Sequence, residues 1–368
     1  MRRLFRSSAP MVLLIVFFGS PLRAHGLPKK IAVANGIYLF MTPGYGDVGY
    51  DGNSVVIVSR DGVLVFDANG TPAAAEAVLA EIRKITDLSV RYLVISHWHW
   101  DHWYGTEVYK KAFPDIRIIS QEKERAIMMG PELEFNKAGL ETDLPDYIAT
   151  LEKKVAAQQA MSPQPSGLAR LKDLIAADRF FLEQKREVHR TYPNVTYGNA
   201  LDIYMGERHI RVLHYDRAVT PGDSFLYLPD EKIIVAGDLL VNPISWTLSS
   251  YPTGWLSTLE KMERLDASVI IPGHGTPLHD KELLHATMEV FRECLKKGAE
   301  AKAQGLNVVQ AKASILPGLH DLKVKITKDD PDLNREFETQ LVGWFLYRVY
   351  DELNGPLTDA IASIPKAE

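Results

Sequence analysis

The 368-residue sequence contains almost no cysteine, and Cys294 is its single thiol. One thiol cannot form an intramolecular disulfide, so a disulfide-stabilised fold is excluded. Cys294 falls in a segment with helical spacing of apolar residues, which predicts a small buried side chain and not a nucleophile.

Long runs of one charge are also missing, and the formal net charge is −5 at pH 7. The composition therefore gives no support for binding to nucleic acid or for electrostatic attachment to a membrane, and it favours a small-molecule substrate. No internal repeat or low-complexity tract interrupts the chain. With 46% hydrophobic residues the chain can bury a sizeable core, as one large domain with an appendage or as two smaller domains.

The only compact apolar run with a basic start lies at the N-terminus. Arg2, Arg3 and Arg6 precede an apolar stretch over residues 11–18, and a polar stretch ends at Ala24. This layout predicts a secretory signal peptide over residues 1–24, and hence export to the periplasm or the extracellular space. The run is too short for a permanent transmembrane helix, although an uncleaved N-terminal anchor is the alternative.

Strand-like and helical segments alternate along the rest of the chain. Apolar runs predict strands at 36–40, 54–59, 63–66, 92–95 and 117–119, and a second set at 210–213, 224–228, 233–235 and 268–271. Asp61-Gly62 predicts a hairpin turn. Thr71 and Pro72 are typical of the start of a helix, here over residues 71–85, and residues 253–265 form a further predicted helix.

Two predominantly helical blocks flank the second set of strands. The helical spacing of apolar residues predicts a helical insertion over about residues 121–187, which overhangs the site. It also predicts a helical C-terminal extension over residues 281–368. In the extension, Asp330-Pro331 opens a helix that ends at Asn354-Gly355. Its apolar face packs against the core or, alternatively, forms a homodimer interface; this face consists of Phe337, Leu341, Trp344 and Phe345.

One short segment concentrates metal-binding side chains. His97, His99, Asp101 and His102 lie within six positions, although the chain has only 11 histidines. Imidazoles and carboxylates at short range are the ligands that zinc prefers, and a loop leaving a strand can point alternate side chains the same way. A histidine-rich surface loop without metal is the alternative.

Two further candidates each follow a predicted strand. Asp238 comes after the 233–235 run within Ala236-Gly237-Asp238, and His274 comes after the 268–271 run within Pro272-Gly273-His274-Gly275. Loops at strand ends often carry functional groups, and flanking glycines let the backbone approach an ion closely. Together with the histidine-rich segment they predict one metal centre.

This order of motifs resembles the metallo-β-lactamase superfamily, over roughly residues 37–277. The resemblance implies an α/β fold, a four-layer αβ/βα sandwich over residues 30–280, with the metals at one edge between two sheets. It also implies a zinc-dependent hydrolase that uses a metal-bound hydroxide on an ester, lactone, amide or phosphoester. Asp101 is then a candidate catalytic residue that binds the metal and orients this water. Asp67 is then expected to fix the loops and not to bind metal.

The chain departs from the superfamily at one ligand. Where a third histidine of the first metal position is expected, the sequence has Val219, which cannot bind zinc. His214, five residues earlier, is a substitute or simply a strand-end histidine. We therefore expect one firmly bound zinc at Asp101, His102, Asp238 and His274. The first position is expected to be weak, empty, or completed by solvent through His97, His99 and a bridging Asp238. In an empty first position His97 becomes a candidate general base.

Aromatic residues surround the histidine-rich segment. Trp98, Trp100, Trp103 and Tyr104 are candidates for lining a substrate pocket, or they pack the loop onto the core. Two functions compete with hydrolysis. Val219 leaves open a metal-binding protein without catalysis, and some proteins of this fold are iron-dependent oxidoreductases.

Overall fold

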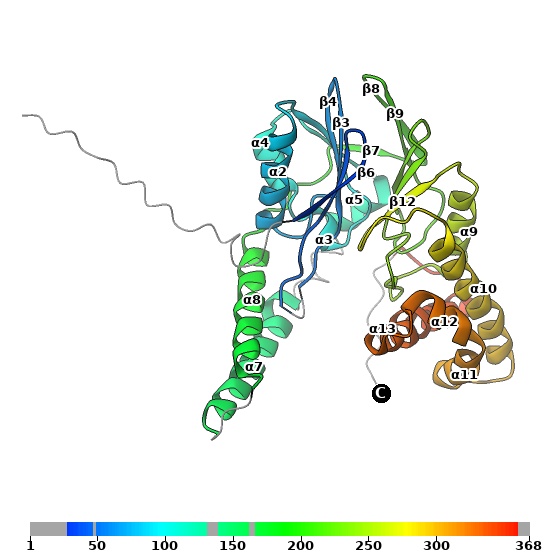
Figure 1. The fold of residues 1–368 in the computed structure, drawn as a ribbon. Helices are drawn as coiled ribbons and strands as arrows, with labels where there is room; N and C mark the ends of the chain where they lie inside the picture. Colours follow the sequence, from blue (N-terminus) through cyan, green and yellow to red (C-terminus); the bar gives the residue numbers. More distant parts are fainter. Residues whose placement is uncertain (1–27, 47–48, 131–138, 162–165, 360–368) are drawn as a thin grey trace, which may run out of the picture.

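The computed structural model describes residues 28–46, 49–130, 139–161 and 166–359, so the predicted signal peptide lies outside the described residues. Two β-sheets face each other at the centre, and helices cover the outer face of each (Figure 1). This is the predicted four-layer αβ/βα sandwich.

The first sheet has seven strands in the order in which they follow along the chain. Its N-terminal strands pair antiparallel and its last four run parallel. The strands are β1 (Lys29–Ala34), β2 (Ile37–Met41), β3 (Ser54–Ser59), β4 (Gly62–Phe66), β5 (Val90–Val94), β6 (Arg117–Gln121) and β7 (Val195–Tyr197).

The second sheet has five strands, and only its last two along the chain run parallel. In spatial order they are β12 (Val269–Pro272), β11 (Ile233–Gly237), β10 (Phe225–Leu228), β9 (Arg208–Leu213) and β8 (Ala200–Met205).

The helical segments before the second sheet are α2 (Pro72–Ile85), α3 (Trp100–Trp103), α4 (Thr106–Ala112), α5 (Glu122–Met128), η1 (Gly139–Asp143), α7 (Leu144–Gln159) and α8 (Leu168–Arg186). The helical segments that follow the first strands of the second sheet are α9 (Pro252–Glu263), α10 (Glu282–Ala303), α11 (Val308–Ile315), η2 (Leu316–Leu319), α12 (His320–Thr327), α13 (Pro331–Glu336), η3 (Phe337–Gly343) and α14 (Trp344–Asn354).

Local sequence signals account for several of these boundaries. Ser59 pairs with Gly62 across the predicted hairpin turn. Thr71 caps α2 by accepting a hydrogen bond from the backbone of Ala74, and Pro72 occupies the first turn. The caps at both ends of the predicted 330–355 helix are also confirmed, because Asp330 accepts hydrogen bonds from the first turn and Gly355 follows the last residue of α14.

Three apolar layers hold the sandwich together. The middle layer lies between the sheets and includes Ile57 and Leu226. A second layer packs α2 and α4 against the seven-stranded sheet, and it includes Val78. The third packs α9, α10 and α14 against the five-stranded sheet, where Phe291 and Phe345 stack with ring centroids 4.0 Å apart. Burial of these faces from water drives their association.

The C-terminal helices belong to this third layer. Phe337, Leu341 and Phe345 are buried in it, which is the core-packing role predicted for that face. The predicted continuous helix is instead α13, η3 and α14 in succession, because residues 337–343 adopt a π-helical turn. Among the residues that the structure describes, no helix combines the length and hydrophobicity needed to cross a bilayer.

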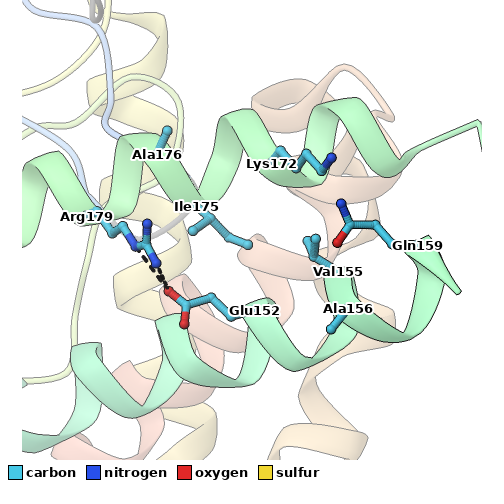
Figure 2. Close-up of a pocket in the computed structure, with 8 residues that line it drawn as sticks. All are labelled: Glu152, Val155, Ala156, Gln159, Lys172, Ile175, Ala176 and Arg179. Atoms are coloured by element: carbon cyan, nitrogen blue, oxygen red, sulfur yellow. Dashed lines mark hydrogen bonds and ion pairs between the residues drawn. The ribbon is translucent and has the colours of Figure 1, made fainter.

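The long helices α7 and α8 pair into an arm that projects from the body (Figure 1). A hollow of about 290 Å³ lies between them, and Arg179 Nε bonds Glu152 Oε1 at 3.0 Å across it (Figure 2). The other end of α8 meets the body, where Phe181 stacks on Tyr45 with centroids 5.4 Å apart. The division of the chain into a catalytic domain, an insertion and an extension stays a prediction.

Candidate metal centre

The candidate ligands gather where parallel strands of both sheets end. β4 and β5 run parallel in one sheet, and β11 and β12 run parallel in the other. The segment 97–102 follows β5, Asp238 follows β11, and His274 follows β12. Because the carboxyl ends of parallel strands open at the same edge, these segments meet although they are far apart in the sequence.

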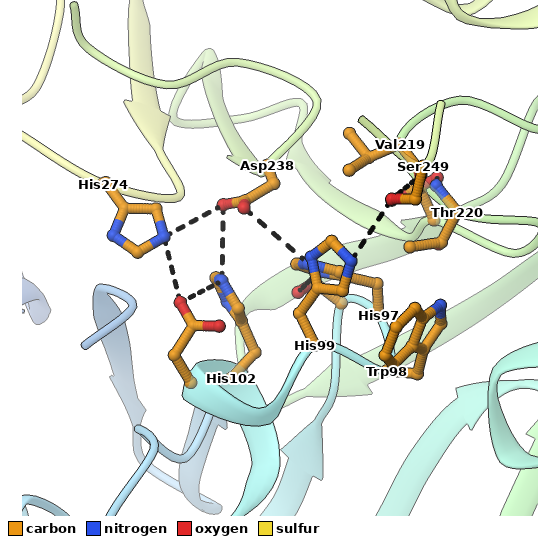
Figure 3. Close-up of polar contacts among 12 residues, drawn as sticks. His97, Trp98, His99, His102, Val219, Thr220, Asp238, Ser249 and His274 are labelled. Atoms are coloured by element: carbon orange, nitrogen blue, oxygen red, sulfur yellow. Dashed lines mark hydrogen bonds and ion pairs between the residues drawn. The ribbon is translucent and has the colours of Figure 1, made fainter. Parts of the chain in front are cut away.

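The histidine-rich segment divides between a loop and a short helix. His97 and His99 lie in the loop after β5, and α3 then carries Asp101 and His102. The imidazoles of His97 and His102 face Asp238, which comes from the other sheet, and His274 lies on the far side of Asp238 (Figure 3). His97 and His102 are completely buried.

One group of four donors surrounds a common point. Asp101 Oδ2 lies 3.1 Å from Nε2 of both His102 and His274, and Asp238 Oδ1 lies 3.3 Å and 3.5 Å from the same two nitrogens. Two ligands of one tetrahedral zinc, each about 2.0–2.1 Å from it, are separated by roughly 3.3 Å. These four side chains therefore have the spacing of ligands that share an ion.

A second group includes the other oxygen of the same carboxylate. Asp238 Oδ2 lies 3.7 Å from His97 Nε2, and the rings of His97 and His102 are 4.3 Å apart. The ligand atoms of these three residues lie within 4.8 Å of one another. The predicted ligand His99 is in neither group, although its ring lies 4.5 Å from that of His97. Asp238 thus lies between the two groups, as expected for a bridging carboxylate.

The polar atoms at this point have no hydrogen-bond partner of their own. Among the residues described, the buried atoms without one include His97 Nε2, Asp101 Oδ2, His102 Nε2 and Asp238 Oδ1. Burying such atoms without a partner costs free energy, and native structures rarely tolerate it. A cation bound among them would satisfy all four, so the residues present fit a metal ion.

Asp67 fixes the histidines from behind without facing the centre. Its Oδ1 accepts a hydrogen bond of 2.7 Å from the Ser96 backbone N–H, and its Oδ2 accepts one of 2.7 Å from Ser96 Oγ. Oδ2 also lies 2.7 Å from His102 Nδ1. Both oxygens are therefore used within the protein, in agreement with the predicted loop-fixing role.

These contacts decide which imidazole nitrogens can bind a cation. The Ser96 hydroxyl donates to Asp67, so it accepts from His97 Nδ1, 2.8 Å away. His102 Nδ1 likewise donates to Asp67. When neutral, both rings therefore present an unprotonated Nε2 to the centre.

Replacing Asp67 with asparagine is expected to weaken metal binding by about 10–100-fold, the usual cost of an altered outer-shell partner. An asparagine that keeps the Ser96 N–H contact points its amide NH₂ at two groups that also donate, Ser96 Oγ and His102 Nδ1. Competition with a chromophoric chelator measures the change. An unchanged dissociation constant would show that Asp67 does not orient the ligands.

The loop that carries His274 is tied to the first sheet. Asn53 Nδ2 donates to the carbonyls of Pro272 and Gly275, each at 2.9 Å, and its backbone N–H donates to Gly273 at 2.7 Å. Gly273 approaches Asp238 so closely that a Cβ there would lie 2.0 Å from Asp238 Oδ1. Any side chain at position 273 would therefore displace the central carboxylate.

The imidazoles and carboxylates of the candidate ligands shift one another's pKa values and so set the charge of the cluster. Burial by itself would lower the pKa of His274, but Asp238 and Asp101 outweigh it and raise this pKa to about 10. Burial would raise the pKa of Asp238, yet the neighbouring His102 and His274 hold it well below its ordinary value. For His99 burial prevails and lowers the pKa to about 4. Two carboxylates balanced by imidazolium protons offer negative charge that a cation can take over.

Removing metal with a chelator is expected to lower the melting temperature by roughly 5 °C relative to protein saturated with zinc. A ligand at 100 times its dissociation constant adds about 2.7 kcal/mol to the free energy of unfolding, and each kcal/mol shifts a protein of 150–250 residues by about 2–4 °C, with smaller shifts for longer chains. Scanning calorimetry with EDTA and then with restored zinc measures it. Superimposable transitions would show that no ion binds the folded state.

Val219 stands where the third histidine of the first metal is expected, and among the described residues no other imidazole takes its place in a ligand group. Val219 is fully buried and offers only its carbonyl, which accepts a hydrogen bond of 3.2 Å from Ser249 Oγ. His214 Nδ1 is 2.9 Å from the Asp223 carbonyl, and this histidine is in neither ligand group found among the described residues. Ser249 Oγ also lies 3.5 Å from His99 Nε2 (Figure 3).

One buried carboxylate at this edge is absent from the sequence prediction. Glu124 of α5 accepts hydrogen bonds from the backbone N–H of Trp98 (2.6 Å) and Gly222 (2.6 Å) and from Thr220 Oγ1 (2.9 Å). It thus joins the histidine loop to the loop around Val219. Burial raises its pKa to about 7. No local motif marks Glu124, because its partners are 26 to 98 positions away.

The aromatic residues of the segment separate into two classes. Trp98, Trp103 and Tyr104 are at most 3% exposed and pack in the second apolar layer. Trp100 is partly exposed, and Lys185 of α8 lies 3.7 Å from its ring centre. Tyr50, which the sequence did not single out, is 45% exposed and lies between Trp100 and His274, 5.2 Å and 5.8 Å away. Tyr50 and Trp100 therefore form an aromatic rim beside the ligands.

Comparison with known proteins adds three findings. A family model described as the metallo-beta-lactamase superfamily matches residues 48–274, more than half of the chain. A linear primary-alkylsulfatase of Pseudomonas sp. (strain ATCC 19151) is 22% identical over 253 residues, which cover 65% of this chain and 44% of that protein. The chain thus spans less than half the length of this curated relative.

Solved structures share the fold at low sequence identity. A metallo-beta-lactamase from Pontibacter korlensis superimposes with a TM-score of 0.51 at 15% identity, over 72% of this chain and 99% of that one. The structure of TMB-1 gives a TM-score of 0.51 at 14% identity, over 73% of this chain and 98% of that one. At such identities the likeness establishes the architecture of the sandwich.

Proposed function

This chain belongs to the metallo-β-lactamase superfamily, and we propose that it applies the metal-dependent hydrolase chemistry of that superfamily, with zinc, to an ester, lactone, amide or phosphoester bond of a small molecule. The observation that carries the proposal is the group of buried, unpartnered atoms shared by Asp101, His102, Asp238 and His97. These atoms come from two sheets and face one another and His274 at 3.1–3.7 Å, so one cation among them would satisfy all of them at once.

A bound metal would supply a nucleophilic water near neutral pH and would polarise the substrate oxygen. Asp101, His102, Asp238 and His274 would hold it at the four-donor position. Asp101 Oδ2 lies between two imidazoles, so this carboxylate is the group placed to orient the attacking water. Tyr50 and Trp100 supply an apolar surface for the part of the substrate that does not react.

The candidate bonds are those of sulfate esters, carboxylic esters, lactones, amides and phosphoesters. The relative named for linear primary alkyl sulfates supports testing them first, and the aromatic rim suits an aliphatic chain. A β-lactam ring is one case of the amide class.

The test is a substrate panel given to the purified, zinc-loaded protein. It contains a linear alkyl sulfate, a chromogenic carboxylic ester, a lactone, a phosphodiester and a cephalosporin. We expect turnover of at least one, abolished by EDTA and restored by zinc. Stoichiometric metal without turnover of any would contradict the proposal and favour the second candidate, a non-catalytic metal protein, for which Val219 is the supporting observation.

Export is the remaining part of the proposal, and it is supported by the basic start, apolar run and Ala24 of the N-terminal sequence. Cleavage after Ala24 predicts a mature chain that begins at His25. Mass spectrometry of the protein from a periplasmic extract measures this. A chain that keeps residues 1–24 and stays with the membrane would indicate an uncleaved anchor.

A further inference from the structure

We propose that Tyr50 is a further catalytic residue, whose hydroxyl donates a hydrogen bond to the substrate oxygen that gains negative charge during hydrolysis. The inference rests on the proposed function, because it assumes that a substrate reacts at the metal centre. The observation behind it is the position of Tyr50, whose ring lies 5.8 Å from that of His274 and 5.2 Å from that of Trp100. The side chain is 45% exposed, so a substrate can reach it.

The backbone directly after Tyr50 is tied to both segments that carry the four-donor group. The Gly52 N–H donates to the Asp101 carbonyl at 3.2 Å, within the short helix that carries two of the donors. The Asn53 N–H donates to the Gly273 carbonyl at 2.7 Å, one residue before the histidine from the other sheet. The position of Tyr50 is therefore coupled to the position of the candidate ligands.

The residues on either side of Tyr50 are held as well. Gly49 and Tyr45 exchange two backbone hydrogen bonds, of 2.9 Å and 2.7 Å. The carboxylate of Asp51, which is only 7% exposed, accepts a hydrogen bond from the Gly70 N–H. Tyr50 thus stands on a segment fixed by hydrogen bonds at both sides. A donor that is already in place costs no reorganisation when charge develops beside it.

The hydroxyl of Tyr50 is available to a substrate. Among the residues that the structure describes, it has no hydrogen-bond partner. Partial removal from water, followed by the charges of Asp101 and Asp238, raises its pKa, so the phenol keeps its proton at neutral pH. Charges act strongly only at short range, so the influence of these two carboxylates agrees with a hydroxyl that lies near the ligands.

A fixed neutral donor beside the metal centre suits the charge that hydrolysis creates. Water forms the new bond to the reacting atom, an oxygen of the attacked group gains negative charge, and the leaving group departs with the electron pair of the broken bond. Loss of one donor to such an oxygen typically slows an enzyme by about 10²–10³-fold. The phenol keeps its proton throughout, so this role requires no proton transfer from Tyr50.

The first experiment compares Tyr50→Phe with the wild type on the best substrate. Phenylalanine keeps the aromatic rim and removes only the hydroxyl, so kcat should fall by about 100-fold while KM changes little, as for an interaction made only in the transition state. Tyr204→Phe is the matched control, because Tyr204 is a 72% exposed tyrosine of β8 that stacks on His209. A raised KM with unchanged kcat would reduce Tyr50 to an apolar contact and overturn the inference.

The second experiment needs no turnover. Octylphosphonate, a tetrahedral anion that is not hydrolysed, is titrated into zinc-loaded protein in a calorimeter. Tyr50→Phe should bind it at least about tenfold more weakly than the wild type, since a hydrogen bond to a charged group is lost, and Tyr204→Phe should bind it equally well. Equal affinities of Tyr50→Phe and the wild type, or no binding by the wild type, would overturn the inference. In a protein that turns over no substrate, this titration still decides whether the hydroxyl contacts an anion at the centre, so the two proposals fail separately.

Discussion

Replacing Asp238 with asparagine is expected to remove the bound zinc at concentrations that saturate the wild type, and to reduce hydrolysis by more than about 100-fold. Changing a residue that only supports a metal ligand already costs up to about 100-fold in affinity or activity. Asp238 is itself the carboxylate that faces both groups of ligands. One of its oxygens lies 3.3 Å from His102 Nε2, and the other lies 3.7 Å from His97 Nε2. An asparagine keeps the shape but loses the negative charge and presents an NH₂ group that cannot bind a cation.

The measurement is metal content by plasma mass spectrometry after gel filtration, together with turnover of the best substrate. Asp202→Asn is the control, because it removes a carboxylate that lies 2.7 Å from a histidine, His209, on an exposed part of β8 and β9. Its metal content should equal that of the wild type. An Asp238→Asn protein with the metal content of the wild type would contradict the role of Asp238 as a ligand.

His97→Ala is expected to remove the ion of the first metal position wherever the wild type binds one, and to reduce turnover strongly. His97 is completely buried, its Nδ1 is engaged by Ser96, and its Nε2 faces Asp238. Burial and the neighbouring His102 lower its pKa well below the ordinary value, so the ring is neutral and can offer its lone pair to a cation. The ion held by Asp101, His102 and His274 should remain.

This variant separates two roles that the sequence leaves open for His97. Removing a metal ligand lowers the metal content of the protein, whereas removing a general base leaves the metal content unchanged. His214→Ala is the matched control, since His214 is a buried histidine at the same edge whose Nδ1 is 2.9 Å from a backbone carbonyl. Full metal content in His97→Ala combined with lost turnover would favour the general base and would sink its assignment as a ligand.

The parts of the fold that the sequence predicts well depend on short-range signals. The turn at Gly62, the cap at Thr71 and the cap at Asp330 each involve residues within a few positions of one another. Three compact motifs predict six ligands, of which five lie in the donor groups found among the described residues; that they bind metal stays a prediction. The π-helical turn at residues 337–343 was missed, because the apolar repeat there is compatible with a continuous helix.

The contacts that shape the site are long-range, and no pattern in one sequence marks them. Glu124 reaches Gly222, Asn53 reaches Gly275, and Ser249 reaches His99 across 150 positions. Only the packing of the two sheets against each other brings these residues together. The sequence also could not separate the exposed Tyr50 from the buried Trp103, because both are aromatic residues in polar surroundings and only the packing distinguishes them.

The most direct test of the metal centre is an anomalous difference map from crystals of the protein grown with zinc. We predict a peak about 2.0–2.2 Å from Nε2 of His102 and His274 and from one carboxylate oxygen each of Asp101 and Asp238. A map with zinc bound elsewhere, or with these four side chains pointing away from one another, would contradict it.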